Sequence, residues 1–219
     1  MKYSKIIMPI LVMAAFIYFH NSIQFNLFSL GLSWTLSAII PYILELIAAI
    51  LLGLQFSQLL RDRSRTVQRM TLMSSVFVAG GIAFLFNPVY EGDFSNTYQE
   101  VVANVNGDPA IEKGLTMLAL PGCPYCYERI GTLNFLRDRN PDLLISVILV
   151  QEDSMTMENY KSRLLQNIEV RYTEHGSFLA KIVGGSFPAF FYRDEQGQTR
   201  FWRQAGLGTT ALDWIEKRY

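Results

Sequence analysis

The first part of the chain consists of long apolar runs separated by short polar breaks. No charged residue occurs from Ile6 to Leu44, and none occurs from Leu46 to Leu60. A helix of about 20 apolar residues can cross the hydrocarbon core of a bilayer. The pattern therefore predicts an all-α membrane domain over residues 1–89 with three transmembrane helices. The three expected spans cover about residues 5–22, 34–56 and 70–87.

The first apolar run fits either a signal peptide or a membrane anchor. Lys2 and Lys5 supply the basic region that precedes the apolar part of a signal peptide. No convincing small-x-small cleavage site follows the run, so we interpret it as an uncleaved anchor. Polar residues after His20 end the run, and residues 25–30 fit a segment that lies along the membrane surface.

Glu45 is the charged residue within the second expected span, where ionised side chains are costly unless they are paired or hydrated. Two interpretations stay open for it. One is a polar contact inside the helix bundle or with a partner subunit, and the other is a contact with a neighbouring Ser, Thr or Tyr that has no further role. Pro9 and Pro41 predict kinks in their spans.

After Asn87 the pattern changes to shorter apolar runs between turns. Residues 90–100 are polar and predict a linker or a short helix that precedes the domain. Residues 115–120 predict a buried strand, residues 124–139 a helix, and residues 143–150 a second strand that is apolar throughout. Two strands joined by a helical crossover are expected to be parallel and to lie in the centre of a sheet.

The rest of the chain predicts alternating helices and strands. Asp194 to Gly197 fits the turn of a hairpin, and Thr209 or Thr210 fits the cap of the last helix. The remaining expected elements are a short helix or strand at 98–104, a turn at 106–109, helices at 157–167 and 178–183, strands before 193 and at 199–203, and a C-terminal helix at 208–219.

Composition indicates a membrane protein, and the charge pattern predicts its orientation in the membrane. The chain is 50% hydrophobic and 17% charged, which is too apolar for an ordinary soluble domain of 219 residues. Residues 1–87 carry six basic and two acidic residues, which leaves thirteen basic and seventeen acidic residues for the remainder. The basic loop 61–69 and the N-terminus are expected to be cytoplasmic. Residues from about 90 to 219 then lie outside, in the periplasm if the source is a bacterium with two membranes. Nothing in the charge pattern indicates nucleic-acid binding.

The two cysteines of the chain, Cys123 and Cys126, lie between an expected buried strand and an expected helix. Unpaired N–H groups and the dipole at a helix N-terminus stabilise a thiolate, and a cysteine three residues further on lies within disulfide reach. The pattern indicates a reversible dithiol/disulfide centre. A structural staple or half of a zinc site are the alternatives. Closing so small a loop gains little stability, and His20 and His175 lie too far apart in sequence to complete a typical zinc motif. We expect no metal and no cofactor besides the disulfide.

Three features make about residues 101–219 similar to the thioredoxin superfamily. They are the strand–Pro-Gly-Cys123-Pro-Tyr-Cys126–helix sequence, the Gly184-Gly-Ser-Phe-Pro188 segment before an apolar strand, and the hairpin followed by Gly206 and a terminal helix. The resemblance implies an α/β thioredoxin-like domain with a mixed central sheet flanked by helices. It also implies a cis peptide bond before Pro188, in a loop that faces the dithiol.

The Cys-Pro-Tyr-Cys tetrad resembles that of glutaredoxins, but Phe187 precedes the proline where glutaredoxins favour Val. Gly122 stands where thioredoxins have a tryptophan, and Met117 stands where they bury an acidic residue. With its multi-span anchor, the chain looks more like the membrane-tethered periplasmic thioredoxin-like proteins of bacteria.

The resemblance implies a membrane-anchored thiol–disulfide oxidoreductase of the bacterial inner membrane that acts on protein thiols and disulfides. Cys123 would be the nucleophile and Cys126 the resolving cysteine. The residues expected to shape the site or to contact the substrate are Pro124, Tyr125, Phe187 and Pro188. A core aromatic is the other interpretation of Phe187.

The spans contain no cysteine, so a separate redox partner is expected. The alternative function is non-enzymatic: a subunit of a membrane protein complex that uses the thioredoxin-like domain as a binding module. Three spans are more than a simple anchor needs, so we expect partner subunits in the membrane whether the protein is an oxidoreductase or a binding module.

Overall fold

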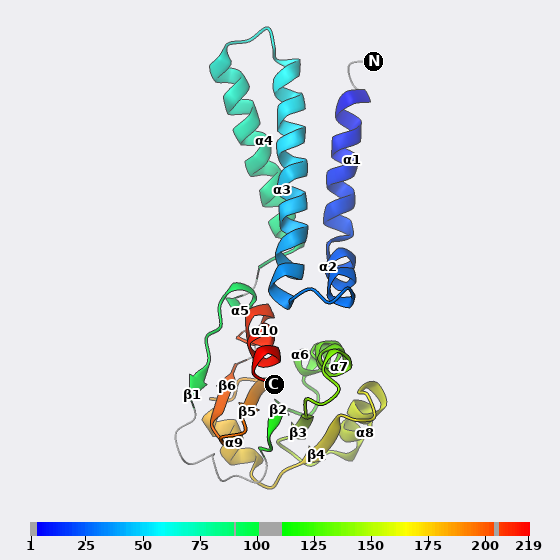
Figure 1. The fold of residues 1–219 in the computed structure, drawn as a ribbon, viewed down its shortest axis with the longest axis vertical. Coiled ribbons are helices and arrows are strands. Elements are labelled where there is room, and N and C mark those ends of the chain that lie inside the picture. The colour runs from blue at the N-terminus through cyan, green and yellow to red at the C-terminus, as the bar shows by residue number, and fades with distance from the viewer. Residues whose placement is uncertain (1–3, 90, 101–110, 204–205) are drawn as a thin grey trace. The chain divides into compact units, whose positions relative to one another are not determined.

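The computed structural model describes residues 4–89, 91–100, 111–203 and 206–219 (Figure 1). The chain forms two compact units, Met1–Tyr90 and Glu91–Tyr219. Each unit is described by itself below.

The first unit is helical, as predicted. Its described helices are α1 (Ser4–Tyr18), α2 (His20–Ser29), α3 (Trp34–Leu59) and α4 (Arg65–Phe86). Among the described residues, α3 and α4 are long and apolar enough to cross a membrane, and the pair α1–α2, which is bent by 60°, would add a third span if it is counted as one. Pro9 and Pro41 lie inside α1 and α3.

Serine residues set the starts of the two long helices. Ser33 and Ser64 are the N-caps of α3 and α4, and their hydroxyls accept hydrogen bonds from the backbone N–H groups three residues later. The α4 helix therefore begins five residues before the expected start of the third span at 70. The basic residues between the two helices lie in an exposed turn.

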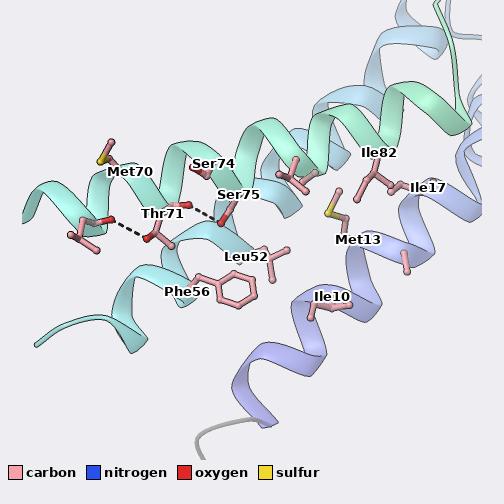
Figure 2. A pocket seen from close by; sticks show the side chains of 14 residues that line it. Ile10, Met13, Ile17, Leu52, Phe56, Met70, Thr71, Ser74, Ser75 and Ile82 are labelled. Carbon is pink, nitrogen blue, oxygen red and sulfur yellow. Dashed lines mark hydrogen bonds between the residues drawn. The ribbon is translucent and has the colours of Figure 1, made fainter. Parts of the chain in front are cut away.

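Small residues bring α3 and α4 together. Ala48, Ala49 and Ala79 are buried at the contact with Met13 of α1. A Cβ atom on Gly53 would lie 2.7 Å from Leu72 Cδ1, so a glycine is needed at this approach. Residues of α1, α3 and α4 line an open apolar groove of about 650 Å³. Figure 2 shows the side chains that line it.

The second unit is built on a sheet of six strands in the described residues, in the order β1-β6-β5-β2-β3-β4. The pairs β2–β3 and β3–β4 are parallel, and the pairs β2–β5, β5–β6 and β1–β6 are antiparallel. The predicted parallel pairing and the predicted hairpin are thus confirmed. The strands are β1 (Gln99–Glu100), β2 (Gly114–Ala119), β3 (Ile145–Leu149), β4 (Glu169–Tyr172), β5 (Ala189–Arg193) and β6 (Thr199–Trp202).

Alternate residues of the strands face two helical layers. Leu118, Ile148 and Phe191 form one core cluster, which includes Leu179 and Val183 from the α9 region. The opposite face carries Trp202 and Tyr192, whose rings contact Trp214 of α10 at 5.7 and 5.6 Å. The helices are α5 (Glu91–Phe94), α6 (Pro124–Glu128), α7 (Ile130–Arg139), α8 (Ser154–Arg163), α9 (Gly176–Ile182) and α10 (Thr209–Arg218).

The single helix expected at 124–139 is two helices, with a break at Arg129. The N–H of Arg129 bonds to the carbonyl of Cys126 at 3.3 Å, three residues back, which tightens the chain at this point. Gly131 and Thr132 follow, and both residue types are weak helix formers.

Residues 91–100 are not a linker, and the segment instead begins with the short helix α5, which agrees with the alternative interpretation. The segment belongs to the second unit and is held by the start of α10: the hydroxyl of Thr209 donates to the carbonyl of Asp93, and that of Thr210 donates to the carbonyls of Gly92 and Ser95. Trp202 Nε1 also donates to Asn96 Oδ1 at 2.8 Å. The polar groups that indicated a solvated linker are satisfied inside the domain instead.

The same contacts change the expected cap of the last helix. Gly208 is the N-cap of α10, because both threonine hydroxyls are used by the 91–96 segment. Strand β4 was not predicted, since it is a short edge strand in which Val170 alone is buried. β1 covers part of the expected 98–104 element, while residues 101–104 and the turn at 106–109 lie outside the described residues.

The docking of the 91–96 segment depends on a close approach at Gly208. A Cβ atom there would lie 1.8 Å from the carbonyl oxygen of Gly92. We predict that Gly208→Ala lowers the free energy of unfolding of this domain by about 1–3 kcal/mol, because the added methyl overpacks the contact. Urea unfolding of the full chain, followed by the fluorescence of Trp202 and Trp214, measures this.

Gly131→Ala is the matched control. A Cβ atom at Gly131 meets nothing within 4 Å, and alanine in a helix is favoured by about 0.5–1 kcal/mol over glycine. This variant is expected to unfold at the same or a higher urea concentration than the natural chain. An unchanged midpoint for Gly208→Ala would contradict the docking of the segment.

Candidate functional site

The cysteine pair follows directly from the central strand. β2 is buried along its whole length and ends at Ala119. Gly122 then adopts a φ of +71°, a left-handed conformation that favours glycine, and the N–H of Cys123 bonds to the carbonyl of Leu120 at 3.2 Å. This tight turn delivers Cys123 to the end of β2.

Cys123 is the N-cap of α6 and Pro124 occupies the first turn, where its missing N–H costs nothing. The N–H of Cys126 donates to Cys123 Sγ at 3.3 Å. The two cysteines form a disulfide with their Cα atoms 5.4 Å apart. Cys126 is fully buried and Cys123 is half-buried, while the side chain of Tyr125 between them is 55% exposed. Cys123 is therefore the more exposed residue of the pair.

The Phe187–Pro188 peptide bond is cis, as predicted. β5 pairs with β2 so that Ala189 lies opposite Leu118, and the same register continued by one residue sets Pro188 opposite Ala119. Pro188 thus lies at the end of the sheet from which the Cys123 loop leaves. Phe187 is half-buried and packs against the core cluster of Leu118 and Phe191, which favours its interpretation as a core aromatic.

An aromatic stack that was not anticipated holds the CxxC helix against α8. The rings of Tyr127 and Tyr160 are stacked at 4.7 Å, and the Arg163 guanidinium lies 5.3 Å from the centre of the Tyr127 ring. Burial raises the pKa of the Tyr160 hydroxyl, which has no hydrogen-bond partner among the described residues. The sequence pattern indicates an inward-facing Tyr160 but carries no sign of this partner, because the two rings come from different helices.

Met117 is fully buried in β2, so this position offers no carboxylate to accept a proton. In the described part of the chain, no group of three or more His, Cys, Asp or Glu side chains is arranged to hold a metal ion.

The first unit (Met1–Tyr90), called the membrane unit below for its candidate membrane spans, contains a second buried polar feature. Glu45 was singled out, but its partner was not: His20 Nδ1 lies 2.9 Å from Glu45 Oε1, and both side chains are buried. The His20 ring also contacts the ring of Tyr42 at 4.6 Å. Because His20 lies 25 residues before Glu45, the sequence around either residue does not indicate that the two side chains meet.

The comparisons with known proteins give one distant likeness to report. No protein-family model matches the chain, and no curated protein matches it. A solved structure of a secreted Mycobacterium tuberculosis disulfide oxidoreductase, described as homologous to E. coli DsbE, is similar with a TM-score of 0.41 and 19% sequence identity. The alignment covers 48% of this chain and 81% of that one.

The loop after β3 ends at Asp153, which caps α8. Its carboxyl accepts hydrogen bonds from the Thr156 hydroxyl and, at 3.1 Å, from the N–H of Met155. The hydrogen bond from Thr156 holds the pKa of this carboxyl below its usual 3.8. A carboxyl whose pKa is lowered by folding stabilises the fold above its unfolded pKa, and this contribution is lost as the pH falls through the folded value.

We therefore predict that Asp153→Asn, which keeps an oxygen for the cap but does not titrate, is less sensitive to acid than the natural chain. Urea midpoints of both proteins at about pH 5 and about pH 2.5 give the comparison, with a smaller loss expected for the variant. An NMR titration of the Asp153 carboxyl carbon should give a pKa below 3.8, and a value at or above it would contradict the assignment.

The strand order, the parallel β2–β3 pair joined through the CxxC helices, the antiparallel β5–β6 hairpin and the cis-proline before β5 occur together in residues 91–219. This second unit has a thioredoxin-like fold with a CxxC disulfide.

Proposed function

We propose that the protein is a thiol–disulfide oxidoreductase that acts on protein thiols and disulfides through Cys123 and Cys126. The observation that carries this proposal is the unequal burial of the disulfide. Cys126 is fully buried, whereas Cys123 is partly exposed at the N-terminus of α6, so we expect a substrate to attack the sulfur of Cys123 and not that of Cys126.

In the oxidising direction, a substrate thiolate attacks Cys123 Sγ, the Cys123–Cys126 bond breaks, and Cys126 leaves as a thiolate that takes up a proton. A second substrate thiolate then attacks the substrate sulfur of the mixed disulfide and releases Cys123 as a thiolate. The substrate loses two electrons, which the cysteine pair gains, and its two thiol protons go to solvent, which in turn supplies the proton taken up by Cys126. In the reducing direction, the Cys123 thiolate attacks a substrate disulfide and Cys126 resolves the mixed disulfide.

The residues around the pair have supporting roles in this proposal. The N–H of Cys126 donates to Cys123 Sγ and stabilises a thiolate there, and Pro124 shapes the first turn. The exposed Tyr125 ring and the Phe187–Pro188 loop contact an extended substrate segment. The strength of the thiolate stabilisation decides whether the protein oxidises or reduces its substrates. A strongly stabilised thiolate makes the reduced form stable, and a protein with a stable reduced form is an oxidant.

The proposal places α3, α4 and the α1–α2 pair across the cytoplasmic membrane of a bacterium. Arg61 and Arg63 lie in the turn between α3 and α4, and Arg65 and Arg69 lie at the start of α4. Basic segments of this kind stay in the cytoplasm. Residues 91–219 then face the periplasm, where disulfide exchange has substrates. The chain has no cysteine besides the pair, so its electrons pass to or come from a separate redox partner.

Cysteine trapping tests the exchange chemistry. Cys126→Ala in the full chain is expected to accumulate mixed disulfides with substrate proteins, because nothing resolves the bond to Cys123. Cys123→Ala, which leaves the buried sulfur, is expected to give at least about tenfold fewer adducts. Non-reducing electrophoresis with mass spectrometry reads both. Equal adducts from the two variants, or none from Cys126→Ala, would overturn the proposal.

Labelling tests the orientation. We consider cells whose outer membrane has been permeabilised and whose cytoplasmic membrane is intact. In these cells a membrane-impermeant maleimide should modify Cys123 after mild reduction. A chain with Asp62→Cys and both natural cysteines replaced by alanine should be labelled only after the membrane is disrupted, since Asp62 is exposed in the α3–α4 turn. The reverse pattern would contradict the proposed orientation.

A further inference from the structure

One carboxylate oxygen in the membrane unit is left without a partner. Glu45 is 3% exposed, and its Oε1 lies 2.9 Å from His20 Nδ1. Its other oxygen, Oε2, is buried and has no hydrogen-bond donor among the described residues. An unsatisfied oxygen of a buried carboxyl is costly, and intramembrane acidic residues commonly mark functional contacts.

Glu45 lines a cavity of about 180 Å³ between α3 and α4. The walls are otherwise nearly all apolar. The Tyr42 hydroxyl is also at the cavity, but it donates to the carbonyl of Asn87 at 3.1 Å. The α4 side is formed by Ala79, Gly80, Ala83 and Phe84.

The size of the cavity decides what it can take. Pockets for drug-sized molecules and cofactors have about 300–1,000 Å³. At about 180 Å³ this cavity is too small for them, and its walls suit a side chain with an apolar stem and a polar tip.

The surface around the cavity permits a helix to approach. Gly80 is exposed, and a Cβ atom there would meet nothing within 4 Å. Phe84, which lines the cavity, is also exposed. Small residues on a membrane helix let another helix pack closely and let polar side chains bond across the contact.

A second copy of this chain fits the site poorly. If two copies packed in parallel through this face of α4, the same stretch of each α4 helix would lie at the same depth in the membrane and face the other copy. From Val76 to Phe86 that helix carries no side chain able to donate a hydrogen bond.

We propose that this face of α3 and α4 binds a transmembrane helix of a different membrane protein, which inserts a hydrogen-bond-donating side chain into the cavity and satisfies Glu45 Oε2. Long donors with an apolar stem, such as Lys, Arg or Gln, match the shape. The inference rests on the membrane placement proposed above and is independent of the cysteine chemistry, because it involves neither cysteine.

Photocrosslinking in native membranes tests the interface in the full chain. Phe84 is replaced by p-benzoylphenylalanine, a larger aromatic at an exposed position beside the cavity. Irradiation is expected to give an adduct with one membrane protein. Mass spectrometry should locate the crosslink in a transmembrane helix that carries a donor side chain within one turn of the modified residue.

Two neighbouring glycines provide a matched pair of variants. Gly80→Ile blocks the cavity mouth and is expected to lower the adduct yield at least about tenfold. Gly81→Ile adds the same side chain one position further along, outside the cavity lining, and should leave the yield within about twofold. A Cβ atom on either glycine meets nothing within 4 Å, so both variants are expected to fold. Glu45→Leu should also lower the yield, but it leaves His20 unpaired and is therefore the secondary variant.

Each outcome decides the matter. Loss of the adduct in Gly80→Ile but not in Gly81→Ile, with a donor in the crosslinked helix, supports the proposal. Equal yields from the two variants, an adduct with lipid only, an adduct with a second copy of this chain, or a crosslinked helix without a donor would each overturn it.

Discussion

Strand β2 is hydrogen-bonded along both of its edges, to β3 in parallel and to β5 in antiparallel register. Every residue of the strand is buried, so its register cannot slip without moving apolar side chains out of the core. The strand delivers Cys123 to one end of the sheet, and its pairing with β5 brings Pro188 to the same end. The chemistry proposed for the cysteines depends on this one strand and its two neighbours.

The unequal burial of the two sulfurs follows from the same arrangement. Gly122 turns the chain sharply enough to leave Cys123 at the surface, and one helical turn later Cys126 is directed into the core. The stack of Tyr127 on Tyr160 holds that turn against α8. A pair arranged in this way is read most simply as an exchange centre, because a structural staple across three residues would gain little.

In the membrane unit the corresponding constraint is the cost of burying charge. Glu45 and His20 satisfy each other in part, the other oxygen of Glu45 has no donor among the described residues, and Glu45 lines a small, mostly apolar cavity. Three candidate spans and an unsatisfied acceptor together favour a membrane part that does more than anchor the domain.

The sequence by itself determined the features that are local or periodic. These are the long apolar helices, the parallel strand pair, the hairpin and the CxxC pair at a helix start. The cis bond before Pro188 was expected only through the resemblance to the thioredoxin superfamily. Only the tertiary structure decided the contacts between distant residues. Glu45 meets His20 25 positions away, and Thr210 holds the carbonyl of Gly92 across 118 positions, which turned an expected linker into part of the domain. Such a hydrogen bond forms only where the fold brings two distant segments together, and this meeting point cannot be predicted from residue type or spacing along the chain.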